Sequence, residues 1–469
     1  MLGGIALTLW VVVFLLGLTS WGGSKASYVF FSCVFLAVIC LAVPASSSYT
    51  YLFISTFLFV GLWLKISIHT WLQTPYLEPV GYFRESPEAW NTLLLVCTAG
   101  GAGVVAARLL YFRLRRPVMR SDHEARSGPI GAPPWFRAWR VWLWLGAGAL
   151  VAFCLVTNEM FGLLKLGRVP RWYLPWPLHG VYGWLMGGGL SLIMGVLLWW
   201  DVQWGFRSRV GILALLATAF FVSISAFSRG LYFLQTLPLI AFILIEGRKV
   251  VGRGWKPLAG FMAAWALGLA LTVVSGNYFR YFSQDQIPIF WTDQGKRDVV
   301  KGGVWGNLLY GWVSFLVIDR WPGLEGVMAV SSYPDKGIPL LVRVATERRQ
   351  VNKADFYTAE VARSGFNDER AKTYHYASVS GPIAFLFYTG SLWIVFIGMC
   401  GLTFLLMMCE HMIAGLTRNP LVCAIFGAYG AFLFVQISSG LAQPVSSLVF
   451  TLTAIGTLHL WRLSRCQPG

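Results

Sequence analysis

The sequence predicts an all-α integral membrane protein with about twelve transmembrane helices, and three observations support this fold class. Of its 469 residues, 57% are hydrophobic and 12% are charged, whereas soluble domains carry about 25% charged residues. The apolar residues gather in blocks of roughly twenty, the length that a helix needs to cross the hydrocarbon core. Basic residues concentrate between alternate blocks. A soluble enzyme, a disordered protein and a fibrous repeat are therefore excluded.

The apolar blocks also predict how the chain is divided. Residues 1–275 carry nine membrane helices with short loops, residues 276–382 form one large loop, and residues 383–469 carry three further helices and a tail. The expected helices, with bounds accurate to a few residues, are 4–21, 27–45, 49–66, 90–112, 138–158, 180–200, 210–227, 231–246, 257–275, 383–408, 421–438 and 445–461.

The basic residues predict the orientation of these helices. The connection 113–140 holds seven arginines and two acidic residues, which is typical of a cytoplasmic loop. Alternation then puts both termini in the cytoplasm and the loop 276–382 in the periplasm. Within that loop, the apolar segment 303–318 is too short to span, so we expect a re-entrant or interfacial helix. The net charge of +17 is explained by the cytoplasmic loops, and we expect membrane lipids rather than nucleic acid as partners.

Ionisable groups are rare at mid-depth in the predicted spans. Lys65, Arg108 and Glu246 fall near span ends, where long side chains reach the membrane interface. Ion-coupled transporters keep charged groups partway across the bilayer. The sequence therefore disfavours transport, although a flippase with a basic, water-filled cavity remains open.

Polar residues concentrate in the loop 276–382, which holds thirteen Lys and Arg and eleven Asp and Glu. The guanidinium group matches the geometry of phosphate, so an arginine-rich loop suits a diphosphate ligand. Arg229 lies in a short hairpin between apolar helices, Arg280 lies just beyond a span, and Arg320 follows the segment 303–318. If that segment dips into the membrane, these three guanidiniums converge at the outer leaflet. Solvated surface arginines are the alternative interpretation.

His375 is the histidine of the large loop and the first candidate for a general base, since imidazole is largely neutral near pH 7. Neighbouring aromatic residues such as Tyr281 and Tyr376 are candidates for stacking on sugar rings, or for an interfacial aromatic belt. No DxD pattern in a convincing context and no CxxC pair occurs, so we expect no metal, cofactor or disulfide framework. The alternative bases are His69, His179, Asp319, Glu325 and Asp355.

The architecture and three stretches of sequence resemble the Wzy-type repeat-unit polymerases of bacterial surface polysaccharides, over residues 210–405. The stretches are the turn Ser225–Gly230, the loop from Arg280 through Asp319 and Arg320, and the segment 374–390 that contains HYASVSGPIAFLFYTG. A second large outer loop, which some members of that family have, is missing because the loop 159–179 is short.

The resemblance implies a metal-independent membrane glycosyltransferase at the periplasmic face of the bacterial inner membrane. Such an enzyme transfers a growing glycan from undecaprenyl diphosphate to the non-reducing end of another lipid-linked repeat unit, with a chain-length regulator and a flippase as partners. It implies that Arg229, Arg280 and Arg320 bind the donor diphosphate and that His375 or a carboxylate such as Glu325 activates the acceptor.

Three alternative functions remain open. An O-antigen ligase would transfer the same glycan to lipid A-core, and a lipid-linked oligosaccharide flippase would carry out no chemistry. A polyprenyl-monophosphate-sugar transferase is disfavoured because the first outer loop, residues 20–27, holds Lys25 and no acidic residue.

Overall fold

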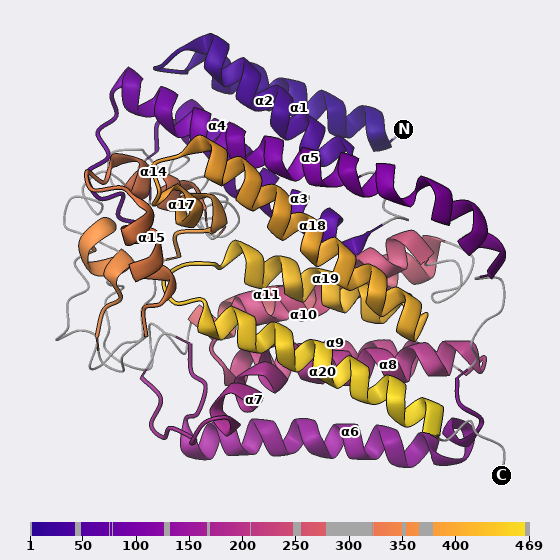
Figure 1. Cartoon of the computed structure of the whole chain (residues 1–469). Coiled ribbons are helices and arrows are strands. Elements are labelled where there is room, and N and C mark those ends of the chain that lie inside the picture. Colours follow the sequence, from indigo (N-terminus) through magenta and orange to yellow (C-terminus); the bar gives the residue numbers. More distant parts are fainter. Residues whose placement is uncertain are drawn as a thin grey trace.

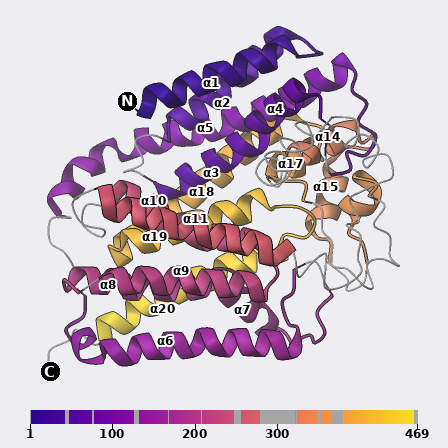
Figure 2. The same ribbon diagram turned by 180° about the vertical axis from the view of Figure 1, so that it is seen from behind.

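The computed structural model describes residues 2–42, 48–74, 76, 78–125, 132–166, 169–206, 208–246, 255–277, 321, 323–348, 353–364 and 379–464. Throughout these residues the regular structure is helical, which confirms the all-α fold class. Long helices lie side by side with their axes in roughly the same direction (Figure 1). The short helices α14, α15 and α17 gather at one end, here called the outer end, and the described chain ends lie at the opposite, inner end (Figures 1 and 2).

The helices before residue 278 are α1 (Leu2–Thr19), α2 (Lys25–Cys40), α3 (Tyr49–Leu58), η2 (Phe59–Leu64), α4 (Lys65–Leu72), α5 (Pro87–Ala125), α6 (Pro134–Phe161), α7 (Leu178–Trp184), η3 (Leu185–Gly189), α8 (Leu190–Gln203), α9 (Ser208–Ser225), α10 (Arg229–Glu246) and α11 (Trp255–Asn277). Those after residue 320 are α14 (Leu324–Ser332), α15 (Ile338–Ala345), η7 (Tyr357–Val361), α17 (Pro382–Phe387), α18 (Leu392–Thr417), α19 (Pro420–Val435) and α20 (Ala442–Ser464). The elements η2, η3 and η7 are π-helical, and η2 and η3 each lie inside a longer helix.

Seven helices of the described chain are long and apolar enough to cross a membrane, which supports the membrane class. Five shorter apolar helices, α1, α2, α10, α19 and α20, coincide with the remaining predicted blocks. That these five also cross the bilayer stays a prediction. The segment 303–318 lies outside the described residues.

One predicted span has the wrong bounds. The block 383–408 is divided, because α17 ends at Phe387 and the membrane-length helix α18 begins only at Leu392. Gly390 adopts the left-handed conformation, which glycine reaches without steric cost. The Ser391 hydroxyl then accepts the backbone N–H of Ile394 at 3.4 Å and caps α18. This turn and cap interrupt an apolar run that hydropathy alone reads as continuous.

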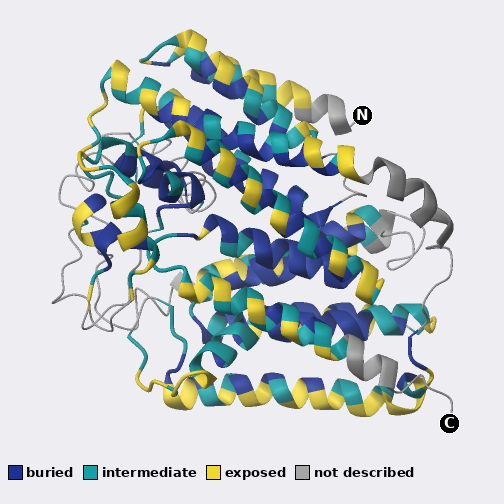
Figure 3. Cartoon of the chain, viewed as in Figure 1, coloured by how far each residue is buried: buried dark blue, intermediate teal, exposed yellow. Residues whose placement is uncertain are grey.

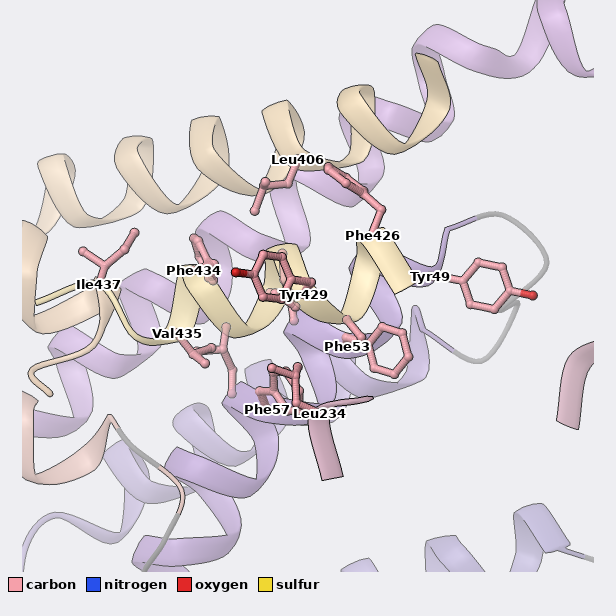
Figure 4. Packing of buried hydrophobic residues seen from close by; sticks show 14 of the residues in the cluster. Tyr49, Phe53, Phe57, Leu234, Leu406, Phe426, Tyr429, Phe434, Val435 and Ile437 are labelled. Carbon is pink, nitrogen blue, oxygen red and sulfur yellow. The ribbon is translucent and has the colours of Figure 1, made fainter. Parts of the chain in front are cut away.

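The core of the bundle is centred on α19, where thirteen of the sixteen residues are buried. Leu406 of α18 lies on one side of α19, near Phe426, and Phe53 and Phe57 of α3 and Leu234 of α10 lie on the other side (Figure 4). A Cβ atom at Gly427 would lie 2.7 Å from the backbone nitrogen of Thr50, so the absent side chain permits this close packing of α19 on α3. By contrast, α6 exposes many apolar residues (Figure 3), and so does α11, as lipid-facing helices do.

Two charged side chains are buried, contrary to the expectation that they extend to the membrane interface. Lys65 and Arg108 are 1% and 0% exposed. The Arg108 guanidinium donates from Nε to the carbonyl of Leu41 at 3.4 Å and lies over the ring of Tyr51. It therefore binds the carboxyl end of α2, where helix carbonyls lack partners. The side chain of Glu246 is outside the described set.

Two carboxylates also join helices within the bundle. Glu410 of α18 is buried and accepts hydrogen bonds from the Ser48 hydroxyl at 2.6 Å and from the N–H groups of Tyr49 and Thr50, both at 2.8 Å. It thus caps the start of α3, where an anion is favoured. Asp201 of α8 is paired with Arg140 of α6 at 2.6 Å.

Candidate functional site

Arg229 is the first residue of α10, and the turn before it is held at several points. Phe227 has a positive φ of 54°, and the Ser228 hydroxyl accepts the N–H of Leu231 at 3.3 Å. The side-chain amide of Asn158 donates to the Ser225 carbonyl at 3.0 Å. The half-buried Arg229 side chain therefore extends from a well-fixed hairpin at the outer end.

A second cation, which the sequence did not single out, lies beside this turn. The Lys165 ammonium lies 4.4 Å from the ring centroid of Phe227 and 2.5 Å from the Glu159 carboxylate. The backbone N–H of Leu166 donates to the carbonyl of Ala226 at 2.9 Å, which fixes the loop that carries the lysine. The position of Lys165 in a short outer loop is the only sequence signal for it.

A buried ion pair lies between the membrane helices and the outer helices. Lys65 Nζ is 2.5 Å from Glu325 Oε1, and the two side chains are 1% and 2% exposed. The same ammonium donates to the backbone carbonyl of Trp321 at 3.2 Å. Lys65 follows the π-helix η2 directly, and such bulges in helices are frequent at functional sites. Glu325, predicted as a catalytic residue, is therefore the partner of a lysine.

The Trp321 ring connects this pair to the helix that bears Arg229. Its centroid lies 5.5 Å from that of Phe57 in α3 and 5.6 Å from that of Phe233 in α10. Phe233 and Arg229 are four residues apart and so lie on one helix face. The residue that follows Arg320 in the sequence thus contacts the helix face of Arg229. Arg320 itself lies outside the described residues, as do Arg280, Tyr281, His375 and Tyr376.

The alternative bases that the structure describes are engaged in local contacts. His69 is buried, with Nδ1 at 3.0 Å from the Thr74 hydroxyl and its ring stacked on Tyr76. Asp355 accepts the N–H of Thr358, in the first turn of η7, at 2.8 Å. The ring of His179 lies 5.8 Å from that of Tyr173, at the start of α7.

Helix α14 connects the ion pair to the outer surface. Seven of its nine residues are buried, and a Cβ at Gly326 would lie 1.9 Å from the Ser380 carbonyl oxygen. A crevice at Gly323 and Gly381 has about 10 Å³ of space, room for about one water molecule. This crevice is therefore too small for a sugar ring.

Among the described side chains, no group of three or more His, Cys, Asp or Glu residues could hold a metal ion. The geometry offers cations at the outer end, on α4, on α10 and on the loop after α6. Comparison with known proteins finds no matching family model, no matching curated protein and no matching solved structure.

Proposed function

We propose that the protein is a polymerase that transfers a glycan from undecaprenyl diphosphate to the non-reducing end of another lipid-linked repeat unit. The contact of Trp321 with Phe233 carries this proposal. This contact brings Trp321, the sequence neighbour of Arg320, to the helix face that bears Arg229. The resemblance assigns Arg229 and Arg320 to the same diphosphate. Lys165 beside Phe227 adds a further cation.

The proposed chemistry needs positive charge and a base. When the glycosidic bond to the diphosphate breaks, negative charge develops on the leaving oxygen, and fixed guanidiniums stabilise it without a metal. Arg229, Arg280 and Arg320 have this role in the proposal. His375 removes the proton of the acceptor hydroxyl as that oxygen attacks the anomeric carbon.

The proposal gives Glu325 a changed role. A carboxylate that lies 2.5 Å from an ammonium and is 2% exposed is poorly placed to collect a proton from a sugar. We therefore propose that Glu325 positions Lys65. Lys65 in turn donates to the Trp321 carbonyl and so positions the backbone next to Arg320.

The decisive experiment supplies purified protein with lipid-linked repeat units alone. Chain growth supports the polymerase, and growth of product only after lipid A-core is added supports an O-antigen ligase instead. Arg229→Ala is expected to abolish chain growth. Arg209→Ala, an exposed arginine at the inner end of α9, serves as the matched control and is expected to retain full activity.

Two further variants of the assay test the mechanism. Arg320→Lys is expected to lose much activity because a point charge cannot replace the bidentate fork. A chelator is expected to have no effect, and loss of activity that a divalent ion restores would favour metal-assisted departure of the leaving group.

A lipid-linked oligosaccharide flippase is the second candidate, and the buried Lys65 and Glu325 pair favours it. Ionisable groups inside a membrane bundle mark transport pathways in many proteins. Movement of lipid-linked repeat units across proteoliposomes without any chain growth would support the flippase and exclude the polymerase.

A further inference from the structure

Three aromatic rings form a row at the outer end, on segments far apart in the sequence. The ring centroid of Tyr82 lies 6.5 Å from that of Tyr333, which follows α14, and Tyr333 lies 6.2 Å from Phe356. Tyr82 is 47% exposed, and Tyr333 is half-buried. Phe356 is buried, at 9% exposed, so Tyr82 and Tyr333 are the rings of the row that offer surface to the solvent.

An arginine lies over each end of the row. The guanidinium carbon of Arg363 is 4.6 Å from the centre of the Tyr82 ring, and that of Arg343 is 4.5 Å from the centre of Phe356. A guanidinium stacked in this way keeps N–H groups at its edge for hydrogen bonds. Both arginines are exposed, so these donors are accessible.

Carboxylates also border the row. Burial and the negative charges of Asp335 and Glu360 raise the pKa of Tyr333, against a smaller opposing effect of Arg343. The Tyr333 phenol therefore stays protonated near neutral pH and can donate a hydrogen bond. The surface combines apolar ring faces with donors and acceptors at their edges. A belt of aromatic residues that faces lipid is not bordered by so many charged groups. A sugar ring is apolar on its faces and polar at its rim, so it matches a surface of this kind.

The row is fixed to the rest of the protein. The backbone N–H of Gly81 donates to the carbonyl of Ala362 at 3.2 Å, and that of Gly337 donates to the carbonyl of Tyr388 at 2.8 Å. The Lys336 ammonium donates to the carbonyls of Ser331 and Tyr333. These bonds hold the rings in place before any ligand binds, which lowers the entropic cost of binding.

Its position relative to the ion pair also fits a glycan. Glu325 and Tyr333 are eight residues apart along α14, about 12 Å at the rise of an α-helix. A glycan whose diphosphate is bound beside Trp321, whose carbonyl accepts from Lys65, would have to cover about this distance to reach the row, and the crevice beside Gly323 is too small for it.

We propose that the rings of Tyr82 and Tyr333, with the buried Phe356 packed against Tyr333, form a platform that binds the oligosaccharide of a lipid-linked repeat unit, with Arg343, Arg363, Asp335 and Glu360 as hydrogen-bonding groups at its rim. The sugar-binding site stands on this geometry, and its assignment to the repeat unit rests on the proposed function. The platform is separate from the diphosphate site, and its role is to raise the affinity of the protein for the glycan.

The test uses full-length protein in detergent and the free oligosaccharide that mild acid releases from the lipid-linked repeat units of cells lacking this protein. Binding is measured by titration calorimetry and saturation-transfer NMR. Tyr82→Ala and Tyr333→Ala are each expected to weaken binding about threefold to tenfold because a stacking ring is lost. Tyr82→Phe keeps the ring and is expected to bind within about twofold of the unaltered protein. Tyr333→Phe keeps the ring but loses the phenol donor, so its binding is expected to lie between those of Tyr333→Ala and the unaltered protein. Tyr173→Ala is the matched control, since Tyr173 is also 47% exposed and lies outside the row.

The outcomes separate this inference from the polymerase proposal. Binding that depends on both tyrosines, without chain growth, supports the platform and removes the polymerase. Chain growth with oligosaccharide binding unchanged in both alanine variants overturns the platform and leaves the polymerase. Absence of any oligosaccharide binding by the unaltered protein also overturns the platform. If Tyr173→Ala weakens oligosaccharide binding as much as the two platform variants do, the effect is a general one of the surface and counts against the platform.

Discussion

Removing one member of the Lys65 and Glu325 pair should destabilise the protein more than removing both. At 2.5 Å the attraction amounts to about 7 kcal/mol with an effective dielectric constant of about 20, and much of it offsets the cost of taking both charges out of water. Glu325→Gln leaves a buried ammonium without its counter-ion, which costs about 3–5 kcal/mol. Lys65→Met leaves the carboxylate in the same position and should cost a similar amount.

The double variant Lys65→Met/Glu325→Leu replaces the pair with apolar groups of similar size. We expect its stability to lie within about 1–2 kcal/mol of the unaltered protein, because replacing a whole buried pair is often neutral. Thermal unfolding in detergent, followed by a thiol-reactive dye that reports exposure of the buried Cys97, measures the difference. The single variants should unfold about 3–5 °C lower than the unaltered protein.

Two results would refute this reasoning. If both single variants unfold at the temperature of the unaltered protein, Lys65 and Glu325 do not form a buried ion pair. If the double variant is as unstable as the sum of the two single variants, the side chains act independently. Chain growth in the double variant gives separate information, since full activity there would remove Lys65 from the proposed reaction.

Three other perturbations test the fold around the site. Glu410→Ala removes the acceptor of three donors at the start of α3, at 2.6–2.8 Å, and should cost about 2–3 kcal/mol; an unchanged unfolding temperature would contradict the capping role. Gly326→Ala places a Cβ 1.9 Å from the Ser380 carbonyl, so it should lower the unfolding temperature and reduce protein level, whereas normal stability would show that α14 can move away. Tyr388 has a buried hydroxyl with no partner among the described atoms, so Tyr388→Phe should be neutral or stabilising. Burial and the charges of Asp355 and Glu347 raise the pKa of Tyr388 above 10.0, so the stability that this phenol contributes is present below pH 10 and is lost as the pH rises above it. The Phe variant should therefore resist alkaline unfolding better, and identical alkaline profiles would exclude the linkage.

The helices could be predicted from the sequence because the signal for each of them is local. A run of about twenty apolar residues forms a helix in lipid whatever its neighbours are, and every predicted block overlaps a helix of the structure. The division at Gly390 and Ser391 was missed because one glycine and one serine barely change the hydropathy of a long window.

The environment of the charged residues could not be predicted, because it depends on contacts between distant parts of the chain. Lys65 and Glu325 are 260 residues apart, and nothing in their local sequences indicates that they meet. Arg108 has the pattern of a side chain at a span end, yet it binds the end of α2. The burial of Lys65 and Arg108 inside the bundle was therefore missed, whereas the rarity of charge at mid-depth in the bilayer, and with it the argument against transport, stays a prediction.

The place of Arg229 in the fold was predicted, whereas its role stays a prediction. Arg229 does begin α10 at a tight hairpin, as its position between two apolar blocks indicated. Lys165 and the contact of Trp321 with Phe233 were missed, because both depend on tertiary packing. The predicted roles of Arg280, Arg320, Tyr281, His375 and Tyr376 stay predictions.

The central claim is that Arg229 and Arg320 face one diphosphate site, and thiol cross-linking tests it most directly. Cysteines are placed at positions 229 and 320 of a protein whose eight native cysteines are replaced, and a short bifunctional thiol reagent is applied in intact membranes. We predict efficient cross-linking of this pair and none between positions 209 and 320, since Arg209 lies at the other end of α9. Failure of the first pair to cross-link, with both thiols shown to be reactive, would contradict the account.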